Sequence, residues 1–141
     1  MPDTKRLEEL SQEYQNLIQR ALEAQEESYC PYSHYPVGAV ALSEGNNIYI
    51  GWNVETVSFN QSVHAEQNAI MRMPKKDRKI KLLIFVSRNG GAPCGHCRQI
   101  ISEFGSPQTK ILGLTTKNNY VTITTLKEIL PLPMSTGEGA L

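Results

Sequence analysis

The segment KLLIFVSRNGGAPCGHCRQIISEF occupies residues 81–104. Its first part, Leu82 to Val86, is a continuous apolar run of strand length, which is typical of a strand that is covered on both faces. The glycines and the proline of residues 90–93 predict a tight loop, and Cys94 to Phe104 are predicted to form a helix. A buried strand followed closely by a helix favours an α/β fold.

The rest of the chain adds elements on both sides of this segment. Apolar residues at helical spacing predict a first helix over residues 4–27. The other predicted elements are strands at 37–42 and 48–52, a helix at 64–73, strands at 110–115 and 120–124, and a short helix at 125–130. This order predicts one domain over residues 1–141, an α/β protein built as a three-layer α/β/α sandwich with one mixed five-stranded sheet. Residues 135–141 are expected to form a flexible tail.

The composition of the chain limits its partners. Fourteen basic residues balance fourteen acidic ones, which argues against a nucleic-acid or anionic-membrane binder. The basic run at residues 75–81 is best explained as a solvated loop. No apolar stretch approaches the ~20 residues that span a bilayer, and the first residues lack the apolar segment of a secretion signal. Because an odd number of cysteines suits a reducing compartment, we expect a cytoplasmic protein with no membrane or nucleic-acid partner.

Cys94 and Cys97 are candidate metal ligands at the start of the predicted helix. Residues three apart share a helix face, so both sulfurs can point at one ion. The electropositive N-terminus of the helix also favours the thiolate form. Taken alone, this pattern fits a redox pair or half of a structural zinc site equally well. His96, between the two cysteines, is expected to point away from the site, as a surface residue or one that contacts the ligands from outside.

His64 and Glu66 add an imidazole and a carboxylate. Positions two apart do not share a face of a regular helix, so we expect this pair where a helix begins. A structural zinc site needs four protein ligands, whereas His64 with Cys94 and Cys97 makes three and leaves a position for water, as in catalytic sites. Glu66 or Cys30 could close the site as a fourth ligand. Structural sites favour Cys and His over carboxylates, and Cys30 is better explained as a small buried thiol.

The combination H-x-E…P-C-x-x-C is the signature of zinc deaminases that act on bases, in which zinc activates a water and the glutamate moves protons. Beyond this motif, the chain resembles the cytidine deaminases over residues 14–134. The resemblance rests on CPYSHYPVGA (30–39), GWNVE (51–55), HAEQNAI (64–70), PCGHCRQ (93–99) and EILP (128–131). It implies a cytidine deaminase-like fold and hydrolytic deamination of cytidine and 2′-deoxycytidine to the uracil nucleosides and ammonia, as in pyrimidine salvage.

The resemblance also implies a role for each site residue. It assigns one zinc ion per subunit to His64, Cys94 and Cys97, and the proton shuttle to Glu66. For the small-molecule nucleoside, it assigns the ribose 3′-hydroxyl to Asn53 and Glu55, the base to the backbone around Ala65, stacking to Tyr35 and part of the pocket wall to Phe59, with Val54 as a further substrate contact. Without the resemblance, Asn53 and Glu55 would be interpreted as polar loop residues that follow a strand, and Phe59 fits a core role equally well. A carboxylate at the 3′-hydroxyl would repel a phosphate there and so exclude polynucleotides.

The chain departs from the family pattern at several positions. Tyr35 replaces the usual Phe and brings a hydroxyl that needs a partner. Met134 stands where an aromatic residue that reaches a neighbouring subunit is expected, and Ala92 replaces a Ser. Short members of the family carry three cysteines and an Arg and form tetramers, whereas longer dimeric members carry His with Gln, as at His64 and Gln67. We expect a homo-oligomer, with a tetramer favoured over a dimer.

Three alternative functions remain open at this point. A related deaminase could act on a modified nucleoside, a nucleotide or an aminonucleoside antibiotic. A base-flipping polynucleotide deaminase is disfavoured by the zero net charge. A zinc-binding module without catalysis is disfavoured because Glu66 is present.

Overall fold

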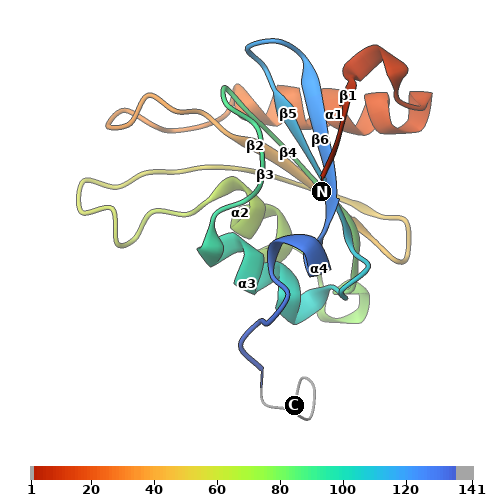
Figure 1. Cartoon of the computed structure of the whole chain (residues 1–141). Coiled ribbons are helices and arrows are strands. Elements are labelled where there is room, and N and C mark those ends of the chain that lie inside the picture. Colours follow the sequence, from red (N-terminus) through yellow and green to blue (C-terminus); the bar gives the residue numbers. More distant parts are fainter. Residues whose placement is uncertain (1, 136–141) are drawn as a thin grey trace.

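The computed structural model describes residues 2–135, which form one six-stranded sheet with helices on both faces (Figure 1). The strand order is β1-β6-β5-β4-β2-β3. Strands β4 and β5 are parallel, and the other neighbouring pairs are antiparallel. The predicted mixed sheet of an α/β fold is therefore confirmed.

Beyond the first helix, the bounds of the elements are close to those expected from the sequence. The strands are β1 Asp3–Arg6, β2 Gly38–Ser43, β3 Ile48–Trp52, β4 Ile80–Ser87, β5 Lys110–Thr115 and β6 Tyr120–Thr125. The α-helices are α1 Gln12–Gln25, α2 Ala65–Met71, α3 Gly95–Phe104 and α4 Leu126–Ile129, and two 3₁₀ turns are η1 Leu7–Glu9 and η2 Lys75–Asp77. None of the helices within residues 2–135 is long and apolar enough to cross a membrane.

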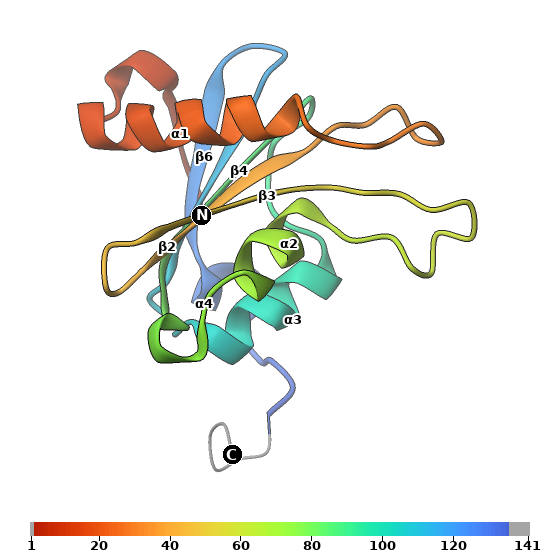
Figure 2. The same ribbon diagram turned by 180° about the vertical axis from the view of Figure 1, so that it is seen from behind.

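The sheet separates two hydrophobic cores. Helix α1 covers one face, and α2, α3 and α4 lie on the other, as the views from both sides show (Figures 1 and 2). The apolar run in β4 alternates between the two cores: Leu82, Ile84 and Val86 pack toward α1. Leu83 and Phe85 pack toward α2 and α3. Both faces of β4 are buried, as its continuous apolar sequence predicts.

The predicted strand count of five is wrong, because Asp3–Arg6 forms a sixth strand at the edge beside β6. These residues were expected to begin the first helix, which instead starts at Gln12 after Ser11. The hydroxyl oxygen of Ser11 accepts a hydrogen bond from the backbone N–H of Tyr14, so Ser11 is the N-cap. All four residues of β1 are exposed, so the strand has no apolar alternation to reveal it.

The predicted C-terminal tail falls mostly on residues that the structure does not describe. The tail was expected at residues 135–141, and the structure describes the chain only as far as residue 135.

Candidate active site

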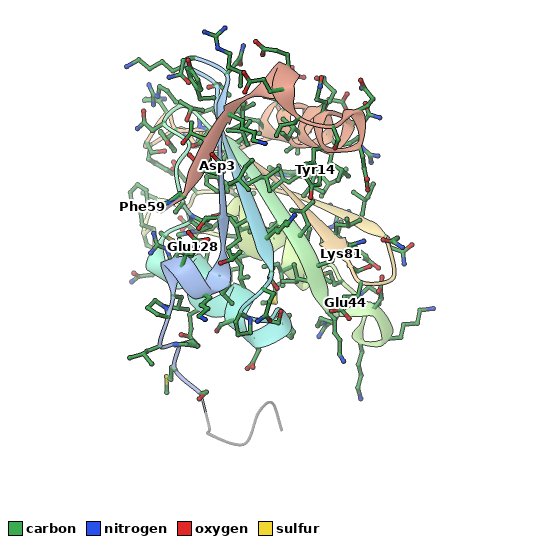
Figure 3. All side chains as sticks on the ribbon, turned by 45° about the vertical axis from the view of Figure 1, so that its right-hand side comes forward. Asp3, Tyr14, Glu44, Phe59, Lys81 and Glu128 are labelled. Carbon is green, nitrogen blue, oxygen red and sulfur yellow. The ribbon has the colours of Figure 1, made fainter. Side chains whose placement is uncertain are left out.

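The candidate site lies at the end of the sheet where β4 ends and β2 begins. Helices α2 and α3 both start there, which brings residues 64–66 beside residues 94–97. The loop that carries Phe59 is at this end, on the side opposite Glu44 and Lys81 (Figure 3). The beginnings of two helices, rather than any long loop, therefore position the chemistry.

His64, Cys94 and Cys97 form a compact group of metal-binding side chains. Their ligand atoms all lie within 4.8 Å of one another. The Nδ1 atom of His64 is 3.3 Å from Sγ of Cys94 and 3.4 Å from Sγ of Cys97. Tetrahedral zinc with Zn–N near 2.1 Å and Zn–S near 2.3 Å separates such atoms by roughly 3.6 Å. The donor set and its spacing therefore fit zinc.

Local backbone geometry leaves these side chains available. His64 is the N-cap of α2 and Cys94 the N-cap of α3, both with extended backbone, and neither side chain caps its own helix. Cys97 lies in the first turn of α3 and is buried. The sequence prediction that His64 and Glu66 occupy a helix start is confirmed.

The electrostatics of this group also favour a cation. Burial raises the pKa of the Cys97 thiol, and the nearby charges of Glu66 and Cys94 raise it further. Burial lowers the pKa of His64, which keeps the imidazole neutral and able to bind a metal. A bound cation deprotonates a coordinating thiol and so offsets the cost of placing these groups together.

Glu66 is a buried carboxyl group on the first turn of α2, with 6% of its surface exposed. Burial raises its pKa, while a hydrogen bond with its own backbone N–H and one with Cys97 act in the opposite direction. A raised pKa suits a group that must both take up and release a proton near neutral pH.

His96 is exposed and is not one of the metal ligands, as expected, but its ring lies beside them rather than away from the site. Its ring centroid is 4.9 Å from that of His64. Its Nε2 is 3.1 Å from Oε1 of Gln67, a hydrogen bond that joins α3 to α2. The unusual Gln67 thus has a hydrogen-bonding partner next to the ligands.

A cavity of about 600 Å³ opens beside the metal group. His64, Glu66 and Cys94 contribute to its lining, whereas Cys97 lies behind them. Of the six predicted substrate contacts, five also line it, namely Tyr35, Asn53, Glu55, Phe59 and Ala65. The structure therefore brings together segments that are up to about sixty residues apart in the sequence.

Val54 is the exception among the predicted contacts. It is not part of the cavity lining. Its backbone pairs with Val63 in both directions, at 2.9 and 2.8 Å, and forms a bridge with Tyr29. In extended chain, neighbours point to opposite sides, so Asn53 and Glu55 face the cavity while Val54 does not. The pairing with Val63 places both polar residues next to His64.

Asn53 is held by three hydrogen bonds. Its Oδ1 accepts from the hydroxyl of Ser28 (2.5 Å) and the N–H of Val37 (2.9 Å), and its Nδ2 donates to the carbonyl of Tyr35 (3.0 Å). Within residues 2–135 the second amide N–H has no recorded acceptor. One donor therefore remains for a ligand.

Glu55 is held by donors from residues 32 and 33. Its Oε1 accepts from the backbone N–H groups of Tyr32 (3.2 Å) and Ser33 (3.1 Å), and Oε2 accepts from the Ser33 hydroxyl. Burial alone would raise the pKa of Glu55, but these hydrogen bonds outweigh it and lower the pKa. The group is thus fixed in place as a carboxylate.

Tyr35 and Phe59 form parts of the cavity wall. The Tyr35 hydroxyl, expected to need a partner, is 3.1 Å from the hydroxyl of Ser87 and accepts from the N–H of Asn89 at 3.2 Å. Phe59 has a positive φ of 57° and is 53% exposed at the rim. Its ring contacts that of Tyr32 edge to face, with centroids 5.6 Å apart.

Sequence reasoning missed three serines in the lining, namely Ser33, Ser62 and Ser87. Ser33 lies inside the CPYSHYPVGA segment, where its position beside Glu55 depends on the tertiary fold. Ser87 ends β4 just before the glycine-rich loop. A polar residue at the end of a buried strand could have indicated that this position belongs to a site.

Three nitrogen and sulfur ligands, with a buried carboxylate and a cavity beside them, define a zinc-dependent hydrolytic enzyme rather than a closed structural zinc site. Comparison with known proteins identifies the family. Residues 11–113 match the sequence model described as "Cytidine and deoxycytidylate deaminase zinc-binding region". The chain belongs to this deaminase family, and its cofactor is zinc.

Individual cytidine deaminases are similar to this chain over most of its length. The chain is 35% identical over 120 residues to a cytidine deaminase of Sporosarcina psychrophila, covering 83% of this chain and 88% of the relative. It is 32% identical to one of Halalkalibacterium halodurans, covering 83% and 90%. A crystal structure of cytidine deaminase from Burkholderia pseudomallei superposes with a TM-score of 0.78 at 27% identity, covering 89% of this chain and all of the other.

Proposed function

We propose that this enzyme hydrolyses cytidine and 2′-deoxycytidine to uridine and 2′-deoxyuridine, releasing ammonia. The observation that carries the proposal is the buried Glu66 next to the His64–Cys94–Cys97 group at the cavity wall. The similarity to cytidine deaminases over more than four fifths of the chain supports the same conclusion.

The mechanism follows from what each residue can do. When bound, zinc supplies a water activated for attack on the amino-bearing C4 of the base. Glu66 takes a proton from that water and delivers one to N3 of the ring. It then passes a proton to the departing amino group, so that cytidine and water become uridine and ammonia. Because Glu66 is buried, this proton transfer takes place away from bulk solvent.

The sugar is proposed to bind at Asn53 and Glu55. The free amide N–H of Asn53 can donate to the 3′-oxygen, and the Glu55 carboxylate can accept from its hydroxyl. Because the pKa of Glu55 is lowered, the group is negative at neutral pH and repels a 3′-phosphate. We therefore expect a free nucleoside to be preferred over a polynucleotide.

The test is the loss of cytidine's ultraviolet absorbance on addition of purified protein, with and without a zinc chelator. Deoxycytidine and both 5′-monophosphates belong in the same assay. The Glu66→Ala variant should retain zinc and lose at least ~100-fold in kcat. Deamination of the monophosphates alone would disprove the substrate assignment. Near wild-type turnover by Glu66→Ala would disprove the proton shuttle.

We further propose that the protein works as a homo-oligomer in the cytoplasm, as part of pyrimidine salvage, with a tetramer favoured over a dimer. Large apolar side chains exposed near the cavity and on the C-terminal segment support association, namely Tyr29, Tyr32, Val57, Phe59, Leu132 and Met134. Light scattering coupled to gel filtration gives the mass directly, and a monomer at micromolar concentration would refute this assembly.

A further inference from the structure

Two hydroxyl groups from distant parts of the chain meet in the cavity wall. Tyr35 precedes β2, and Ser87 is the last residue of β4. Both line the cavity, and their oxygens are 3.1 Å apart. Ser87 is 3% exposed, so it lies within the fold at the wall of this cavity. Cytidine deaminases usually carry a Phe at the position of Tyr35, so the pair is a departure within this chain.

The loop after β4 supplies one further donor to each oxygen. The N–H of Asn89 donates to the Tyr35 hydroxyl at 3.2 Å, and the N–H of Gly90 donates to the Ser87 hydroxyl at 2.9 Å. Gly90 has a positive φ of 57°, and a Cβ there would lie 2.1 Å from Oγ1 of Thr115. The loop is therefore fixed in the conformation that presents these N–H groups.

Counting protons shows that the pair has one left over. Each hydroxyl has one proton to donate and two acceptor positions. The bond between Tyr35 and Ser87 uses one of their two protons, whichever hydroxyl donates it. The two backbone N–H groups occupy acceptor positions and take up no proton. Within residues 2–135, neither hydroxyl has a recorded bond to a further acceptor, so one hydroxyl proton remains.

Tyr35 is also fixed from its other side. The guanidinium of Arg88 lies over its ring, 5.2 Å from the centroid, and donates to the carbonyl of His34 at 3.3 Å. A phenol held between Arg88 and Ser87 loses little freedom when a ligand binds, which is what a recognition group requires.

We propose that Tyr35 and Ser87 together are a specificity-determining donor, whose remaining proton binds an acceptor oxygen of the nucleoside. The acceptor is either the 2-carbonyl of the base or an oxygen of the sugar. The inference rests on the proposed function, because it assumes a nucleoside in this cavity. It adds to the site a neutral donor that the two hydroxyl groups share, whereas a Phe at position 35 would leave Ser87 alone to supply it.

The proton count makes an unusual prediction for variants. Tyr35→Phe and Ser87→Ala each remove one hydroxyl and also the bond that consumed a proton, so each keeps one proton for the ligand. Only the double variant has none. We expect each single variant to bind cytidine with a small loss, and the double variant to lose roughly tenfold or more in affinity. A pair that merely anchors the loop would produce no such pattern across ligands.

The experiment measures nucleoside dissociation constants by calorimetry on zinc-loaded protein that carries Glu66→Ala, so that no turnover occurs. The ligands are cytidine, 2-thiocytidine, and the 2′-, 3′- and 5′-deoxycytidines. The double variant should bind more weakly every ligand that carries the acceptor oxygen. The ligand whose affinity does not fall is the one that lacks this oxygen, and it therefore identifies the acceptor. Tyr120→Phe, a tyrosine on β6 outside the cavity lining, is the matched control.

An equal loss across all ligands, or no loss in the double variant, would overturn the inference. Zinc content and thermal midpoints of each variant separate a binding effect from unfolding. Failure of the proposed function gives a different result, since protein with Glu66 intact would then leave cytidine unchanged in the absorbance assay. If none of the nucleosides binds to the Glu66→Ala protein while protein with Glu66 intact deaminates cytidine, this inference fails and the proposed function stands.

Discussion

At the scale of single residues, Glu55 is a tightly constrained polar group of the cavity. Three donors from Tyr32 and Ser33 hold its two oxygens, and its lowered pKa keeps it ionised. Glu55→Gln should lower kcat/KM for cytidine by roughly tenfold or more, because the amide loses the charge and one acceptor. The same substitution should leave 3′-deoxycytidine nearly unaffected. Steady-state kinetics with both substrates checks this prediction.

The control for Glu55→Gln is Ser33→Ala, which removes one donor to Glu55 but keeps the carboxylate. It should have a smaller effect with the same dependence on the 3′-hydroxyl. If Glu55→Gln lowers activity equally for cytidine and 3′-deoxycytidine, Glu55 acts on the protein rather than on the sugar.

The metal residues could be predicted from the sequence because their geometry is local. Cys94 and Cys97 share one helix turn, and the spacing of His64 and Glu66 already required a helix start. The Tyr35–Ser87 pair could not be predicted in this way. Its members are 52 positions apart, and only the packing of β2 against β4 brings their segments together.

At the scale of elements, Asp77 on η2 fastens the turn between β2 and β3. Its Oδ2 accepts from the hydroxyl groups of Ser43 (2.8 Å) and Tyr49 (2.7 Å) and from the amide of Asn47 (2.8 Å). These three bonds, with Tyr49 contributing most, lower the pKa of Asp77. The hydrogen bond to Asp77 also raises the pKa of Tyr49. The turn is therefore tied to the sheet by one carboxylate.

The stability that Asp77 provides should depend on pH. A carboxyl whose folded pKa is lowered stabilises the fold above its unfolded pKa of about 3.9, and the effect is lost as pH falls through the folded value. A tyrosine whose folded pKa is raised stabilises below about pH 10 and loses the effect above it. Thermal denaturation should show Asp77→Asn below wild type at neutral pH, with the difference vanishing in strong acid. A pH-independent difference would contradict this assignment.

Gly51 in β3 sets how closely α2 approaches the sheet. A Cβ at Gly51 would lie 2.3 Å from the carbonyl of Ala65 and 2.3 Å from the N–H nitrogen of Ala69. Both atoms belong to the backbone of α2, so Gly51→Ala must displace the helix that carries His64 and Glu66. We expect a loss of about 1–3 kcal/mol in unfolding free energy together with weaker zinc binding.

Gly38→Ala is the matched control for Gly51→Ala. A Cβ at Gly38 would lie 2.0 Å from the carbonyl of Ala21, so the same strain falls on α1, on the other face of the sheet. This variant should also be destabilised but should retain its affinity for zinc. Equal loss of zinc in both variants would mean that the metal group responds to global stability, not to the position of α2.

Strand β1 shows where element prediction failed. Its four exposed polar residues carry no apolar pattern, and the strand exists because β6 offers an unpaired edge. The guanidinium of Arg6 over the ring of Tyr120, 5.8 Å from the centroid, adds a cross-strand contact. Strand β4, by contrast, could be predicted from its continuous apolar sequence, because a strand with both faces buried has such a sequence.

At the scale of the whole molecule, zinc should act as a cross-link between the two helices that line the site. His64 begins α2, and both cysteines begin α3, about thirty residues later in the chain. In sequence, η2, strand β4 and the loop after it separate these two segments. Because zinc binds the folded arrangement and not the dispersed ligands of the unfolded chain, it must stabilise the fold.

The size of this effect can be predicted and measured. Free zinc at a thousandfold excess over its dissociation constant stabilises by about 4 kcal/mol, or about 14 °C in Tm for a chain of this size. Stripping the protein with a chelator should therefore lower Tm by about that amount, and zinc should restore it. His64→Ala should start at the lower Tm and be insensitive to the chelator, whereas Cys30→Ala should respond like wild type. A chelator effect that survives in His64→Ala would place the stabilising metal somewhere other than the His64–Cys94–Cys97 group.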